Sequence, residues 1–215
     1  MTPNLVSVRC GKIAPLGPEG ILSGFVKSAV VGVVDVKELG LEGDAQADLS
    51  VHGGPDKAVY AYADGHYPAW AADLPPYVGK FVPGGFGENL TIAGMDESML
   101  CVGDVHAIGN VVLQVCQPRR PCLKLALYFD DIHMPRAMVR SGRSGWYYRV
   151  LQTGAIRAGD VVKLEARPHP DFAFTRLLAI VSHGGASKDE LRRMIAMDGL
   201  AQQWRAQAGR ALQES

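Results

Sequence analysis

Short apolar segments separated by turn residues dominate the sequence from Leu5 to about Arg167 and constrain its fold most strongly. The segments are rich in valine and aromatic residues, as strands are, and glycine and proline divide them. The chain has 25 glycines and 13 prolines, which supply many turns. The sequence lacks the strand–helix–strand alternation of a doubly wound sheet. One local helix is expected over 64–73, with Asp64 as its N-cap. We therefore expect a mainly β fold, either a barrel or a sandwich. The clearest expected strands are 5–8, 29–36, 59–62, 111–115 and 161–164.

The pattern changes after the last of these strands, where apolar residues recur at helical spacing. The first predicted helix ends at Gly184, which suits a helix C-terminus. The second begins with Ser187 and Glu190, a pair that forms a capping box. The third carries large apolar residues in four-residue steps. We predict a β domain over 1–168 and a small C-terminal three-helix unit over 169–215.

The balance of charge excludes some partners. Lys and Arg total 22 and Asp and Glu total 22, so no general attraction to nucleic acid or to an anionic membrane is expected. The first residues do not resemble a signal peptide, and no apolar run reaches the ~18 residues that span a bilayer. We expect a cytoplasmic protein with reduced thiols.

The densest cluster of chemically useful residues runs from Gln117 to Lys124 and contains Cys122. Two prolines stiffen this segment, and Arg119, Arg120 and Lys124 place positive charge near the thiol. Nearby cations favour the thiolate, which binds metals and attacks electrophiles. The alternative is a buried structural cysteine, the usual role of a free cysteine. We favour a functional role for Cys122 and structural roles for the other cysteines: Cys10, Cys101 and Cys116.

A second cluster surrounds the adjacent glycines Gly53 and Gly54. Such glycines let the backbone approach a ligand closely, and consecutive amides bind anions. In this reading His52 forms a hydrogen bond with a cofactor and Lys57 contacts a phosphate. Read alone, however, Gly-Gly-Pro-Asp is strong turn chemistry, and an ordinary β-turn is the favoured interpretation.

A third cluster, Pro83–Leu90, combines three glycines with a Glu-Asn pair. Asn89 offers both a donor and an acceptor to a ligand, whereas the alternative is a flexible hairpin loop. The scattered histidines and cysteines do not predict a zinc site. A hydrolytic pair of Cys122 with His52 stays open, because such partners need only be close in space.

Taken together and in this order, these clusters resemble the MOSC domain, named for the C-terminal part of molybdenum cofactor sulfurases. The tail resembles the three-helix extension of the family's YiiM-like branch. The resemblance covers nearly the whole chain, although Leu123 stands where the family often has an aromatic residue, and 130–144 has no assigned role. The matching segments are GDAQADLSVHGGPDKAVYAY, FGENL, VGDVHAIGNVVLQVCQPRRPCLKL and GAIRAGDVVKL.

The resemblance implies a β-barrel and a molybdenum–pterin cofactor whose metal is bound by one cysteine. The matching residue is Cys122, and a soft thiolate suits such a metal. It also implies a catalytic role for His52 beside Cys122. The residues expected to hold the rest of the cofactor are Arg119, Lys57, His52, Gly53, Gly54, Asn89 and Lys124.

Relatives of this type reduce N-hydroxylated compounds, including purine bases, to amines, which implies a detoxifying reductase. No nucleotide fingerprint or iron–sulfur cysteine set is present in the sequence, so an external flavin or iron–sulfur reductase is expected to supply electrons. A homodimer is compatible with this expectation. Two alternatives remain: a non-redox carrier of cofactor or of sulfur, using a Cys122 persulfide, and a binding module with a structural Cys122.

Overall fold

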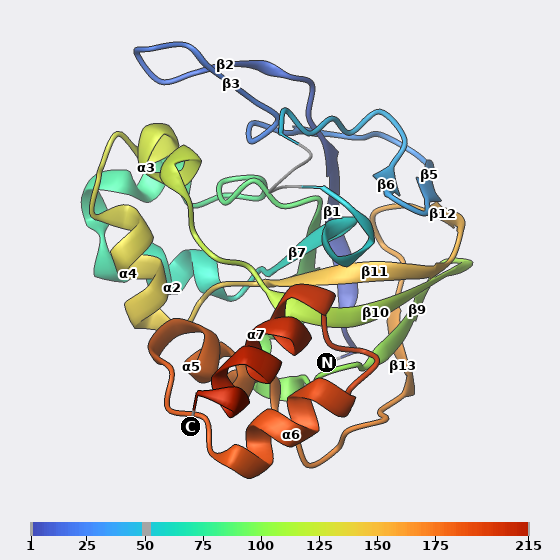
Figure 1. Cartoon of the computed structure of the whole chain (residues 1–215). Coiled ribbons are helices and arrows are strands. Elements are labelled where there is room, and N and C mark those ends of the chain that lie inside the picture. Colours follow the sequence, from blue (N-terminus) through green and yellow to red (C-terminus); the bar gives the residue numbers. More distant parts are fainter. Residues whose placement is uncertain (1, 49–52, 215) are drawn as a thin grey trace.

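The computed structural model describes residues 2–48 and 53–214 and is dominated by one mixed eight-stranded sheet (Figure 1). The strand order is β13-β9-β10-β11-β7-β8-β1-β4. Neighbouring strands are antiparallel except β7 and β8, which are parallel. In chain order the strands are β1 (Asn4–Cys10), β4 (Ser28–Ala29), β7 (Val59–Ala63), β8 (Leu90–Ala93), β9 (Val105–Ile108), β10 (Val111–Pro118), β11 (Trp146–Gln152) and β13 (Val162–Ala166).

The expected sheet-rich fold is found, but a closed barrel is not confirmed. Within the described residues, β1 meets the start of β13 at one isolated bridge, Asn4–Val161, rather than along a ladder. The Leu5 amide also donates to Asp160 O at 2.9 Å. β8 occupies one edge of β1, and on the other edge β4 pairs with Arg9 and Cys10, so that only the first residues of β1 meet the segment around Val161.

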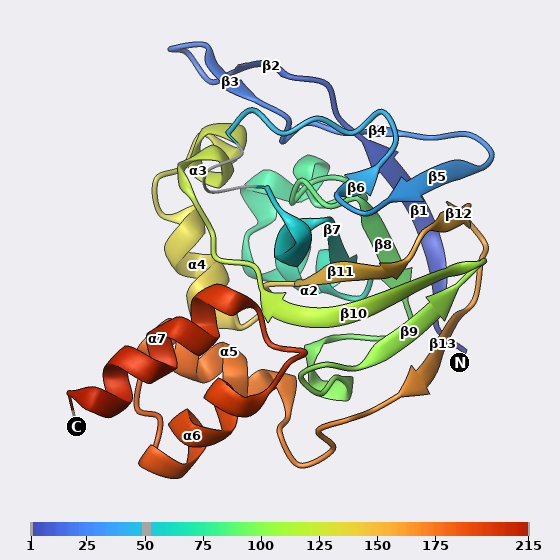
Figure 2. The same cartoon turned by 45° about the vertical axis from the view of Figure 1, so that its right-hand side comes forward.

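Two smaller sheets lie at one end of the main sheet. One contains β12 (Gly154–Ile156), β5 (Val34–Lys37) and β6 (Gly40–Leu41). The other is the hairpin of β2 (Ala14–Leu16) and β3 (Ile21–Ser23), which extends away from the body of the molecule (Figures 1 and 2).

The helices form two groups on different sides of the molecule (Figure 2). One group follows the sheet strands in the middle of the chain, and the other is the C-terminal trio that the sequence predicts. The first group is α2 (His66–Asp73), α3 (Leu123–Phe129) and α4 (Met134–Ser141); the second is α5 (Phe174–His183), α6 (Lys188–Ala196) and α7 (Gln202–Gln213). Three short 3-10 helices are η1 (Pro55–Lys57), η2 (Pro75–Lys80) and η3 (Glu97–Met99).

Local signals explain several helix ends. Ser187 and Glu190 form the predicted capping box, and Gly184 ends α5 with a φ of 76°. The helix expected from residue 64 begins two residues later, at His66, with Gly65 at the N-cap. Asp64 does not cap it: Asp64 precedes the N-cap, and its amide donates to Ile92 O in the sheet. The unassigned segment 130–144 contains α4, which has a proline in its first turn and ends at a left-handed glycine.

Two buried clusters form the core. The larger joins the sheet, through residues such as Trp146 and Tyr148, to the C-terminal helices, through Phe174, Leu177 and Trp204. The smaller is largely aromatic and lies among β7, α2, α3 and α4. The C-terminal helices therefore share a core with the sheet, and the division near residue 168 stays a prediction. In the part of the chain that the structure describes, no helix is long and apolar enough to cross a membrane.

Candidate functional site

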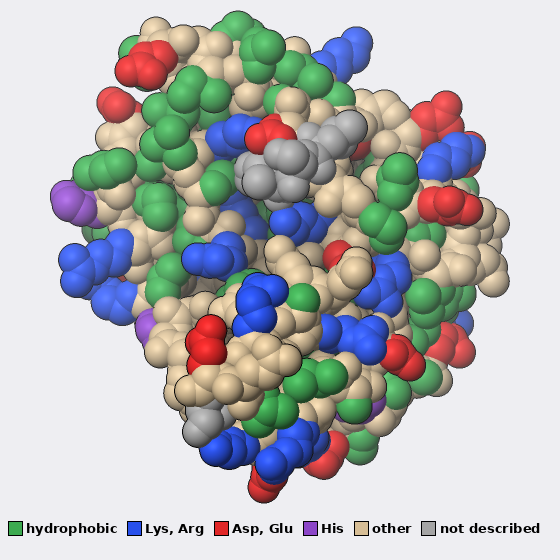
Figure 3. Space-filling view, viewed as in Figure 1, with side chains coloured by type: hydrophobic (Ala, Val, Ile, Leu, Met, Phe, Trp, Pro, Cys, Tyr) green, Lys and Arg blue, Asp and Glu red, His purple; other side chains and the backbone are tan. Residues whose placement is uncertain are grey.

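An open pocket brings together residues from the three sequence clusters. In the view of Figure 3, Lys and Arg side chains gather between the β2–β3 hairpin and α7. The pocket has one thiol, several cations and aromatic walls, the mixture of apolar surface and a few polar groups that is typical of small-molecule sites. The lining includes Phe25, Lys27, Asp44, Lys57, Tyr60, Phe86, Asn89, Arg119, Arg120, Cys122, Lys124 and Tyr147.

Cys122 stands immediately before α3, at the end of the loop that follows β10. Cys122 is partly exposed, and its backbone carbonyl accepts a hydrogen bond from the Leu125 amide at 3.0 Å. Pro118 and Pro121 restrict the backbone of the loop. A partly exposed cysteine that lines the pocket from a restricted loop can meet a ligand there.

Arg119 forms a buried wall of the pocket, with 6% of its surface exposed. Its Nη1 donates to Phe86 O at 2.9 Å and to the Tyr60 hydroxyl at 3.4 Å. The guanidinium carbon lies 5.1 Å from the centre of the Tyr60 ring and 5.5 Å from that of Phe25. A cation held between aromatic faces in this way keeps its charge and has a fixed position.

Lys57 reaches the pocket from η1. Partial burial lowers the pKa of its ammonium, and the nearby Arg120 guanidinium lowers it further, while Asp56 opposes both. Lys124 lines the same pocket. Cations that gather closely enough to affect each other's ionisation are suited to binding an anionic group such as a phosphate.

Asn89 lines the pocket but uses its side chain largely for structure. Its Oδ1 accepts from the Tyr60 amide at 3.1 Å, and its Nδ2 donates to Arg9 O at 3.2 Å and to Asp44 Oδ2 at 2.9 Å. This amide therefore holds β7, β1 and the segment around Asp44 together. A direct bond from Asn89 to a cofactor stays a prediction.

Two of the other predicted residues, Gly53 and Gly54, are not in the pocket lining, and His52 lies outside the described residues. Gly53 and Gly54 immediately precede η1, where the Lys57 amide donates to Gly54 O at 3.0 Å. Gly54 has a φ of 90°, so it serves the turn that presents Lys57.

Sequence reasoning missed several residues of the pocket, above all Lys27 with Asp44, and the aromatic walls. Lys27 Nζ lies 2.5 Å from Asp44 Oδ1. Asp44 belongs to the family-matching segment that begins at Gly43, whereas no motif or residue pattern around Lys27 indicates a site. Tyr60 and Tyr147 read as ordinary strand residues, and no local signal would have separated them from the core.

The remaining cysteines have structural surroundings, as expected. Their thiols lie near the carbonyls of Glu42, Pro170 and Asp56, at 3.5, 3.6 and 3.1 Å for Cys10, Cys101 and Cys116. Burial raises the pKa of each thiol, that of Cys10 to about 11. A raised pKa keeps a thiol protonated and unreactive at neutral pH.

No group of three or more His, Cys, Asp or Glu side chains among the described residues could hold a bare metal ion. A metal at Cys122 must therefore bring most of its ligands with it. A metal complex of an anionic organic ligand meets this condition, because one thiolate binds the metal and the surrounding cations bind the ligand. The donor set of the pocket thus fits a metal–pterin cofactor.

Comparison with known proteins agrees with this site. Residues 48–163 match the MOSC domain. The chain is 39% identical over 199 residues to the protein YiiM of Escherichia coli K12, covering 93% of this chain and 88% of that protein. It is 38% identical over 183 residues to a protein named "Reductase" of Gibberella moniliformis, covering 82% of this chain and 32% of that protein.

A solved structure agrees as well. The crystal structure of YiiM from Geobacillus stearothermophilus superposes with a TM-score of 0.81 at 30% identity, over 98% of this chain and 99% of that one. The chain belongs to the MOSC-domain family. Within that family it stands in the YiiM-like branch, and this membership supports a molybdenum-cofactor-related function.

Proposed function

We propose that this protein is a molybdenum-cofactor-dependent reductase that converts N-hydroxylated compounds, such as N-hydroxylated purine bases, into amines. The observation that carries the proposal is the position of one accessible thiol, Cys122, beside converging cations in a single pocket. The family membership and the relative named "Reductase" support the same direction. The biological role we infer is detoxification.

In this proposal Cys122 supplies the thiolate that binds the metal. Arg119, Arg120, Lys57 and Lys124 bind the anionic part of the cofactor, since all four line the pocket. When bound, the cofactor supplies two-electron reduction at the metal. The role expected for His52 remains part of the proposal, because that residue lies outside the described ranges.

The chain's other contribution is the shape of the pocket. Phe25, Tyr60, Phe86 and Tyr147 give it aromatic walls, which suit a flat, conjugated substrate. Conversion of a hydroxylamine to an amine and water consumes two electrons and two protons. We expect the electrons to come from a separate flavin or iron–sulfur reductase.

Turnover tests the proposal directly. Protein made in a host that synthesises the cofactor is supplied with a chemically reduced viologen and an N-hydroxylated purine, and amine formation is followed by chromatography. The wild type and Cys10→Ala should turn over, because Cys10 does not line the pocket, whereas Cys122→Ala should not. A wild type that binds molybdenum without forming amine would contradict the reductase and favour a carrier.

A further inference from the structure

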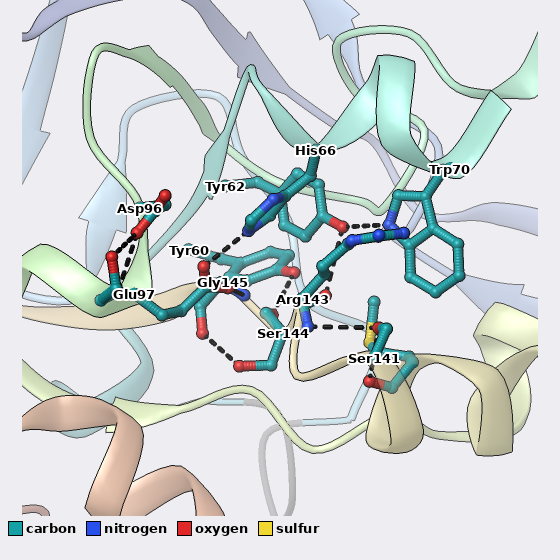
Figure 4. Close-up of polar contacts among 12 residues, drawn as sticks. Tyr60, Tyr62, His66, Trp70, Asp96, Glu97, Ser141, Arg143, Ser144 and Gly145 are labelled. Atoms are coloured by element: carbon teal, nitrogen blue, oxygen red, sulfur yellow. Dashed lines mark hydrogen bonds and ion pairs between the residues drawn. The ribbon is translucent and has the colours of Figure 1, made fainter. Parts of the chain in front are cut away.

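The peptide group between Ser144 and Gly145 is held at both of its polar atoms by buried side chains (Figure 4). The Tyr60 hydroxyl donates to Ser144 O at 2.8 Å. The Gly145 amide donates to Glu97 Oε1 at 2.6 Å. These two backbone atoms belong to one rigid plane, so the two bonds together fix the orientation of that plane.

On one side, this peptide determines how Tyr60 meets Arg119. A tyrosine hydroxyl has one proton to donate. Because the hydroxyl donates its hydrogen bond to Ser144 O, a lone pair of the hydroxyl oxygen is left to accept from Arg119 Nη1, which lies 3.4 Å away. The same ring lies 5.1 Å from the Arg119 guanidinium carbon. Tyr60 therefore holds Arg119 both by its hydroxyl and by its face.

On the other side, Glu97 joins the peptide to His66. Glu97 is 4% exposed, and its second carboxylate oxygen lies 2.6 Å from His66 Nε2. His66 and Glu97 line a second hollow, distinct from the Cys122 pocket, together with Asp96, Arg140, Ser141 and His183. Figure 4 shows His66, Glu97, Gly145, Ser144 and Tyr60 in succession. The hydrogen bonds thus cross the protein from this second hollow to the wall of the Cys122 pocket.

We propose that Tyr60, Glu97 and His66 are positioning residues that, through the Ser144–Gly145 peptide, fix the Arg119 guanidinium against the Cys122 pocket. Arg119 lies near enough to Cys122 for the charge of each to affect the other. A guanidinium that is held in place gives the pocket a constant positive field, whereas a loosened one turns toward solvent and is screened. Tyr60 lines the pocket, whereas Glu97 and His66 are not in its lining and act only through the peptide.

The chemical selectivity of Cys122 reports the position of Arg119 without any cofactor. The full chain, purified from a host that cannot make the cofactor, is treated with iodoacetate, which is anionic, or iodoacetamide, which is neutral. Alkylation of Cys122 is followed by mass spectrometry. The ratio of the two rates reflects local charge, while a change in access alone alters both rates alike.

Tyr60→Phe should lower the iodoacetate-to-iodoacetamide ratio about threefold, as expected for displacing one nearby unit charge. Tyr62→Phe is the matched control: it also removes a buried hydroxyl, one that donates to Arg143 O in the same loop at 3.2 Å but does not contact Arg119. That variant should keep the wild-type ratio. Equal ratios in Tyr60→Phe and the wild type would overturn the proposal.

Variants of Glu97 test whether the hydrogen bond from the Gly145 amide contributes to holding Arg119. Glu97→Gln keeps an oxygen for the Gly145 amide and should retain the wild-type ratio, whereas Glu97→Ala should lower it as Tyr60→Phe does. A Glu97→Ala protein with the wild-type ratio would show that Tyr60 acts alone. If Glu97→Ala does not fold, NMR of the Arg119 side chain tests whether Tyr60 holds the guanidinium. The Nε–H resonance of Arg119 should shift in Tyr60→Phe and not in Tyr62→Phe. The inference refines the proposed function, but these readouts need no turnover, so either can fail separately.

Discussion

Lys27 and Asp44 form a nearly dry ion pair in the wall of the Cys122 pocket, with Nζ 2.5 Å from Oδ1 and side-chain exposures of 7% and 4%. The same carboxylate accepts from the Gly11 amide at 2.7 Å and, through Oδ2, from Asn89 at 2.9 Å. It thus connects β1, the segment that follows β3 and the loop before β8. This relationship leads to a first prediction.

Asp44→Ala should destabilise the protein by about 3–5 kcal/mol, because it leaves the Lys27 ammonium buried without its counter-charge. The control is Asp35→Ala, which breaks an exposed pair with Lys37 whose side chains are 61% and 51% exposed. That change should cost less than about 1 kcal/mol. Urea unfolding measures both, and similar losses in the two variants would contradict the role of burial.

Gly145 and Gly142 provide a matched test of close packing in one loop. Both have positive φ, 66° and 72°. A Cβ at Gly145 would lie 2.3 Å from Ala61 O, whereas the nearest atom at Gly142 would be 3.9 Å away. Gly142→Ala should therefore cost about 1–2 kcal/mol, the strain of left-handed backbone alone. Gly145→Ala should cost clearly more in thermal or urea unfolding; equal costs would show that the loop moves aside freely.

His106 predicts a dependence of stability on pH. It is 2% exposed, its Nδ1 lies 2.6 Å from the Tyr148 hydroxyl, and burial lowers its pKa to about 4. In the unfolded chain the histidine pKa is near 6.5, so between about pH 6.5 and 4 His106 is protonated in the unfolded chain and neutral in the folded protein. This group should therefore cost stability as the pH falls through that window, by about 2 kcal/mol at pH 5.

The comparison of wild type with His106→Asn isolates this effect. The variant should lose less free energy of unfolding than the wild type between pH 7.5 and pH 5, whatever its stability at pH 7.5. Parallel losses in the two proteins would show that other groups cause the pH dependence.

Local signals predicted much of this fold. Four of the five clearest expected strands are found, whereas 29–36 is interrupted and contributes only to the ends of β4 and β5; the C-terminal helices follow apolar spacing with the Ser187–Glu190 cap. The closure expected of a barrel was not predictable, because it depends on where β1 finds partners along its length. That is a competition between distant segments, which no local pattern reveals.

The candidate site was predictable only where local sequence indicated it, because contacts between distant segments leave no local pattern. Cys122, Arg119 and Lys57 stood out because their neighbours were chemically unusual, and the structure brings them to one pocket. Tyr60 and Glu97 did not stand out. Tyr60 sits in a strand pattern that any aromatic residue satisfies, and Glu97 meets Gly145 across 48 positions.

The central claim is that Cys122 binds the metal of a molybdenum–pterin cofactor. We would measure molybdenum and pterin in wild type, Cys122→Ala and Cys10→Ala, all made in a host that synthesises the cofactor. The account predicts metal near one atom per chain in the wild type and in Cys10→Ala, and its loss in Cys122→Ala with the fold retained. Equal molybdenum in Cys122→Ala and the wild type, or none in any of the three, would contradict it.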